Sequence, residues 1–140
     1  MQVGDIVLLF DHLYWMRDRI LTAAEKVPDA FVDGEGVTIR DLRSTLVHEL
    51  DVEWSWRERL RGTPFETWGP DGELKPAAYD TLSSLAEHWR RDEADMRGWL
   101  GELTDHQLNA PWEVEGPGGH LLWYHLMHPS STVNSSATPQ

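Results

Sequence analysis

Three segments of about twenty residues each carry apolar side chains at helical spacing, and stretches rich in Gly and Pro separate them. They run from about residue 5 to 25, 39 to 60 and 81 to 103. In the first, the repeating apolar positions predict a buried stripe made of Ile6, Leu9, Phe10, Leu13, Ile20 and Ala24. Apart from a short extended piece expected at 112–115, no segment alternates like a strand. The pattern predicts an all-α fold.

A fourth helical segment begins near Gly119 or His120 and is interrupted by Pro129. Proline removes a helical hydrogen bond and crowds the preceding turn. The residues after it are small and polar without periodicity, which is typical of disorder. We therefore predict a four-helix bundle over residues 1–128, with a fourth helix short or broken at Pro129, and a disordered tail over residues 129–140.

The connection between the second and third helical segments spans residues 62–80 and contains three Gly and three Pro. A connection of this length in a small domain is usually functional or packed over the helices. Phe65 and Trp68 favour packing.

Charge and composition exclude several classes of function. The chain has 24 acidic and 12 basic residues, a net charge of −12, which argues against binding nucleic acid or anionic membranes. It has no Cys, so any metal must be held by His, Asp or Glu. We see no signal peptide and no membrane-spanning stretch, and therefore expect a cytoplasmic protein.

His48 is the first candidate metal ligand among seven histidines. Small residues surround it on the predicted helix, and it lies beside the row Leu42–Leu46–Leu50. An imidazole at the edge of a core can face a pocket, although a partly exposed histidine on the flank of a helix gives the same pattern.

His125 and His128 are the other candidates. They lie three residues apart on the fourth segment and can share a helix face. With a histidine from another helix they can hold a divalent metal that keeps a position open for water. Two histidines at this spacing also occur by chance. Carboxylates such as Asp92 and Glu93 are predicted to lie on a solvated face.

Four segments together resemble the DinB/YfiT-like family: LLFDHLYWMRDRIL, STLVHELDVEWSWRERLRG, HWRRDEADMRGWLGELTDHQLNAP and LLWYHLMH. The resemblance covers roughly residues 5–128, with the segments in the right order. It implies a four-helix bundle that is often a homodimer.

The resemblance also implies a nickel or zinc ion held by one His of the second helix and two of an H-x-x-x-H motif on the fourth. His48 matches the first ligand, and His128 matches a frequent histidine one turn before the motif. The two motif positions fall on Thr132 and Ser136, so the ligand set is incomplete.

Three hypotheses follow. The chain is a metal-dependent enzyme acting on a small molecule, such as the thiol S-transferases and hydrolases that the resemblance implies, with His48, His128 and His125 holding the metal. Alternatively, it is a non-catalytic bundle that dimerises or binds a protein. A third reading is a truncated or frame-shifted family member.

Overall fold

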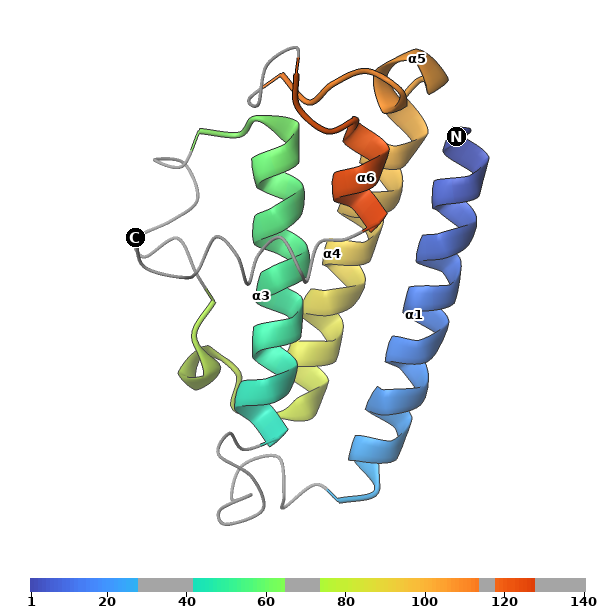
Figure 1. The fold of residues 1–140 in the computed structure, drawn as a ribbon. Coiled ribbons are helices and arrows are strands. Elements are labelled where there is room, and N and C mark those ends of the chain that lie inside the picture. Colours follow the sequence, from blue (N-terminus) through green and yellow to red (C-terminus); the bar gives the residue numbers. More distant parts are fainter. Residues whose placement is uncertain (28–41, 65–73, 114–117, 128–140) are drawn as a thin grey trace.

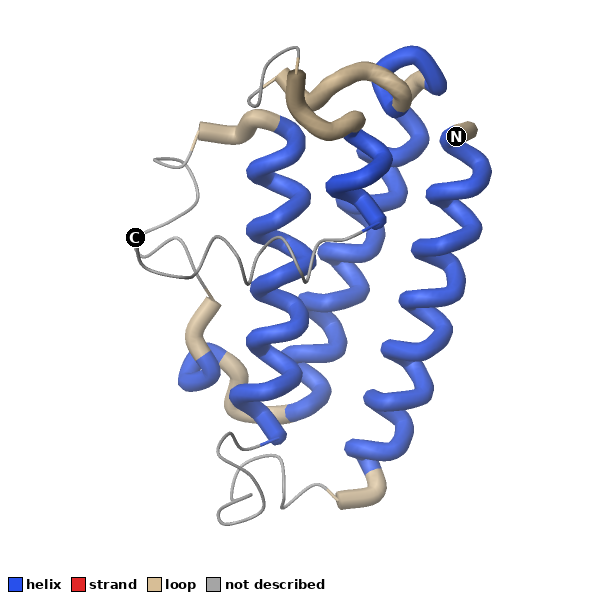
Figure 2. The backbone as a smooth tube through the Cα atoms, in the orientation of Figure 1, coloured by secondary structure: helices blue, strands red, loops and turns tan. Residues whose placement is uncertain are grey.

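The computed structural model describes residues 1–27, 42–64, 74–113 and 118–127. Three long helices lie side by side: α1 (Val3–Glu25), α3 (Leu42–Arg61) and α4 (Leu82–Glu102) (Figure 1). Two short helices, α5 (Asp105–Leu108) and α6 (Leu122–Met127), and the 3-10 turn η2 (Pro76–Ala78) accompany them. The described residues contain no strand, only an isolated bridge between Pro111 and Leu121 (Figure 2). The all-α prediction is confirmed.

The helices do not simply alternate in direction. α3 and α4 run the same way, whereas α1 and α6 run the opposite way (Figure 1). A 20-residue helix is about 30 Å long. The connection between α3 and α4 must therefore return along the bundle, which explains its length. Phe65 and Trp68 lie outside the described residues, as do Pro129 and the predicted tail.

Local side-chain bonds hold the helix starts. The backbone N–H of Gln2 donates to Asp5 at 3.0 Å, and that of Ser84 donates to the Thr81 hydroxyl at 3.1 Å. Such bonds satisfy the free N–H groups of a first helical turn. Asp5 is thus a first-turn partner in α1, which begins two residues earlier than predicted.

The core consists of two apolar clusters. The first, called here the α6-end cluster, contains Ile6, Phe10, Tyr14, Trp56, Leu60, Met96, Leu100, Leu108, Leu122 and Leu126. The second, called the three-helix cluster, contains Leu21, Ala24, Leu46, Val47, Leu50, Tyr79, Leu85, Ala86 and Trp89. Charged residues of α1, α3 and α4 lie between them. The α6 residues Leu122 and Leu126 belong only to the first cluster, so α6 covers one end of the bundle.

The predicted stripe of α1 is only partly buried. Ile6, Phe10 and Ala24 lie in the core, but Leu13 is 37% exposed and Ile20 is 50% exposed. The prediction that these two are buried is wrong, because α3 and α4 pack against the face of α1 that carries Leu21 and Ala24, whereas Leu13 and Ile20 lie on a face that no described helix covers. Of the described helices, none is long and apolar enough to span a bilayer.

Candidate functional site

His48 lies on α3 with its side chain exposed. Its neighbours one turn away differ in burial: Thr45 is exposed and Val52 is buried. The imidazole is therefore accessible to a ligand from solvent, and it lies on the part of α3 that packs in the three-helix cluster.

His125 is buried on α6, at 4% exposure. Its backbone carbonyl accepts a hydrogen bond from Trp56 Nε1 at 3.0 Å, and its ring meets that of Trp112 edge-on, with centroids 4.9 Å apart. These contacts place His125 in the aromatic packing that joins α6 to α3. A structural role accounts for its burial.

His48 and His125 do not lie at the same level of the bundle. His125 contacts Trp56, which is eight residues beyond His48 on α3, or about 12 Å along the helix axis. Two imidazoles bound to one zinc or nickel ion must each come within about 2 Å of it. The structure therefore does not bring these two candidates together. His128, Thr132 and Ser136 lie outside the described residues.

The described residues do not fit the implied metal. Within residues 1–27, 42–64, 74–113 and 118–127, no three His, Asp or Glu side chains are arranged to hold an ion. A nickel or zinc centre needs several nitrogen, sulfur or carboxylate donors around one point. His48 alone supplies one.

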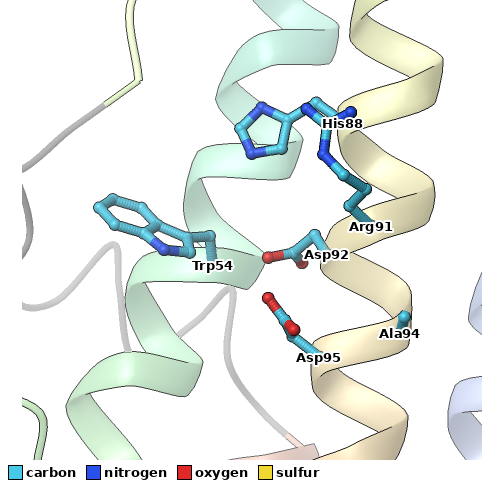
Figure 3. Close-up of a pocket in the computed structure, with 6 residues that line it drawn as sticks. All are labelled: Trp54, His88, Arg91, Asp92, Ala94 and Asp95. Carbon is cyan, nitrogen blue, oxygen red and sulfur yellow. The ribbon is translucent and has the colours of Figure 1, made fainter.

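A pocket of about 410 Å³ opens between α3 and α4. Figure 3 shows His88, Arg91, Asp92 and Asp95 along one side of α4, with Trp54 of α3 facing them. His88 Nδ1 lies 2.6 Å from the Tyr79 hydroxyl, so the ring is held in place. Burial, helped by Arg91, lowers the pKa of His88 and favours a neutral ring at neutral pH. Nothing in the sequence pattern distinguishes this histidine, because its partner Tyr79 lies outside the helical segments.

Charged side chains between the two apolar clusters form what we call the polar layer: Arg17, Glu53, Arg57, Asp92 and Glu93. Arg57 Nη2 and Asp92 Oδ1 are 2.7 Å apart, and both side chains are 2% exposed. Across the bundle, Arg17 Nη2 lies 2.6 Å from Glu93 Oε1. The prediction of a solvated face is wrong for Asp92, because Arg57 compensates its charge inside the core.

Glu53 is the carboxylate of this layer whose pKa differs strongly from its usual value. Its Oε2 accepts a hydrogen bond from Trp89 Nε1 at 2.7 Å. Partial burial, with a smaller contribution from nearby Asp92, raises the pKa of Glu53 to about 7. Burial also raises the pKa of Tyr14, to which Glu53 and Asp92 add, so that phenol keeps its proton.

The surface of α1 carries a second apolar row beside the buried one. We call this row the α1 seam: Ile6, Leu9, Leu13, Met16, Ile20 and Ala23 on α1, with Val27 two residues past the end of the helix. Ile6 is buried and Leu9 partly buried, whereas Leu13, Met16, Ile20 and Val27 are 37–50% exposed. The seam thus starts in the α6-end cluster and continues into solvent.

Antiparallel and parallel long helices, a short closing helix and a buried charged layer define an all-α helical-bundle protein. A family model described as the DinB family matches residues 1–130. Because the match covers almost the whole chain, this chain belongs to the DinB family, as the resemblance implied. Searches of curated proteins and of solved structures returned no match.

Proposed function

We propose that this DinB-family chain functions as a self-associating helical bundle, in which the α1 seam of one copy pairs with the seam of another. The observation that carries this proposal is the exposed apolar face of α1.

The spacing of the seam favours a helical partner. Its members repeat at intervals of alternately three and four residues from Ile6 to Val27. An apolar repeat of this kind is typical of helices that pack along each other, and its helical part runs from Ile6 to Ala23. At one end the seam already packs against α6 through Ile6. A second copy would continue this packing along the rest of α1.

The expected affinity is modest. Burying the exposed half of an aliphatic side chain contributes roughly 1 kcal/mol, so four such side chains on each of two copies contribute roughly 8 kcal/mol. Association itself costs about 4–15 kcal/mol. We therefore expect an equilibrium between monomer and dimer that depends on concentration.

Charges beside the seam make the proposal specific. Arg19 and Lys26 lie seven residues apart along one flank and are both exposed. At a two-fold interface the same surface occurs on both copies, so these like charges approach each other. Added salt screens this repulsion. Pairing of two copies should hold or tighten with salt, whereas binding of an acidic helix would weaken.

Sedimentation equilibrium of the wild type and of Ile20→Glu tests the proposal. We expect the wild type to dimerise at high micromolar concentration and Ile20→Glu to stay monomeric, because the new charge lies in the middle of the seam. Leu8→Glu is the matched control, since Leu8 is more exposed, at 69%, but outside the seam. A monomeric wild type, or a Leu8→Glu effect equal to that of Ile20→Glu, would contradict the proposal.

We keep a second candidate function, a metal-dependent enzyme of the thiol S-transferase or hydrolase type. Membership of the family and the exposure of His48 support it. His48 would supply a nitrogen ligand, and a bound metal would lower the pKa of a thiol or of water. The remaining ligands would have to come from outside the described residues.

Equilibrium dialysis with zinc or nickel tests this second candidate. If His48 is a ligand, the wild type binds one ion per chain and His48→Ala loses at least tenfold in affinity. His106→Ala, an exposed histidine on α5, serves as the control. Equal binding by all three proteins would rule out His48 as a ligand.

A further inference from the structure

Glu53 is the carboxylate of the polar layer that lacks a paired arginine in the described chain. Both buried arginines are held by other acids: Arg17 by Asp18 at 2.8 Å and Glu93 at 2.6 Å, and Arg57 by Asp92 at 2.7 Å and Glu58 at 3.0 Å. The hydrogen bond that Glu53 does accept comes from the neutral indole N–H of Trp89.

The surroundings of Glu53 carry more negative than positive charge. From α1, Tyr14 and Arg17 face it; from α3, Glu49 lies one turn before it and Arg57 one turn after. From α4, Trp89 and Asp92 face it and Glu93 pairs with Arg17, while α6 contributes the imidazole of His125, which packs against Trp56 and Trp112. Two arginines thus meet the carboxylates Asp18, Glu58, Asp92 and Glu93 before Glu53 is counted.

We propose that the polar layer is a proton-binding site, in which Glu53, beside Asp92 and without an arginine partner in the described chain, binds a proton in the folded protein. The neutral carboxyl removes one negative charge from beside Asp92 and keeps Oε2 as the acceptor for Trp89. It also brings a hydroxyl donor into a layer where Asp92 Oδ2 is a buried acceptor without a hydrogen-bond partner in the described chain. Burying a neutral acid costs far less than burying a carboxylate without a counterion.

Proton binding at Glu53 makes the stability of the folded bundle depend on pH. The folded protein holds the proton more tightly than the unfolded chain, because the pKa of Glu53 rises from 4.5 to about 7 on folding. The contribution to stability is complete below about pH 4.5, falls as the pH rises, and is gone above about pH 7. Over that interval, the ratio of folded to unfolded protein falls about tenfold for each pH unit on account of this one group.

Urea unfolding of the wild type and of Glu53→Gln between pH 5 and 8.5 tests the proposal. Glutamine imitates the protonated acid but does not titrate. We expect the wild type to lose stability relative to Glu53→Gln as the pH rises to 7, and the difference to become constant above pH 8. Glu102→Gln, an exposed glutamate at the end of α4 and outside the surroundings of Glu53, is the matched control and should follow the wild type.

Carbon-13 NMR of the wild type supplies a second measurement that does not depend on a variant folding. The Glu53 carboxyl should titrate near pH 7, and the Trp89 indole proton should shift with the same midpoint, because Glu53 accepts its hydrogen bond. A Glu53 midpoint near 4.5, or a difference between wild type and Glu53→Gln that stays constant with pH, would overturn the proposal.

Discussion

Arg57 and Asp92 form an ion pair with almost no access to water. Their charged atoms are 2.7 Å apart, and Arg57 Nη1 also donates to the Asp92 backbone carbonyl at 3.3 Å. Removing both charges from water costs about as much as their attraction returns, so the pair adds little net stability. Removing one partner leaves the other charge buried alone, which is much more costly.

We therefore expect Arg57→Leu to lower the free energy of unfolding by about 3–5 kcal/mol. The double variant Arg57→Leu with Asp92→Leu should recover most of this loss, because no lone charge remains. Arg97 and Asp11 form a comparison pair at 2.6 Å that is 40% and 49% exposed, and Arg97→Ala should cost about 1 kcal/mol or less. Urea unfolding at pH 7 measures all three, and a double variant as unstable as Arg57→Leu would contradict this account.

The burial of Asp92 was not predictable from its own segment. Charged residues surround it in sequence, as on a solvated helix face. Its environment depends instead on Arg57, 35 residues away. Glu53 and Trp89 are a second pair of this kind, 36 residues apart. Residue-level chemistry in this bundle is therefore set between helices, and local patterns do not reveal it.

At the scale of elements, α6 holds one end of the bundle with few residues. Leu126 is 2% exposed, and the His125 carbonyl accepts the Trp56 indole N–H at 3.0 Å. Pro129 predicted a short fourth helix, and the described part of α6 covers six residues. Each buried contact of such a short helix carries a large share of its docking energy.

Leu126→Ala should lower the free energy of unfolding by about 2–5 kcal/mol and loosen α6 from α3. Met127→Ala, on the same helix but 40% exposed, should cost less than half as much. Thermal unfolding measures the loss, and the chemical shift of the Trp56 indole proton reports on the docking. An unchanged Trp56 signal in a destabilised Leu126→Ala protein would show that α6 is held by other contacts.

The bounds of the long helices were predictable, because periodicity and capping are local. α4 was expected over residues 81–103 and is found at Leu82–Glu102. The direction of α4 beside α3 was not predictable, because it depends on which faces meet. The long connection between them was interpreted as functional or packed over the helices, and the parallel direction of the two helices gives a simpler reason for its length.

For the whole molecule, the family and fold followed from the sequence, whereas the site did not. Their spacing favoured His125 and His128 as ligands, and small neighbours beside the leucine row favoured His48, but the level of each residue in the bundle decides which of them can meet. His48 and His125 belong to different levels, and the site that includes His128 stays a prediction. The spacing of apolar residues in the sequence indicates the α1 seam. The exposure of the seam, however, follows only from the position of α6 in the structure.

The division of the interior into two apolar clusters bears on how the protein comes apart. Each cluster has its own apolar contacts, and the charged residues between them offer little hydrophobic cohesion. The end closed by α5 and α6 can therefore open while α3 and α4 stay together at the other end, as a separate cooperative unit. Such partly open molecules would refold without starting from the random coil, and they would expose Trp56 long before the rest of the chain is lost.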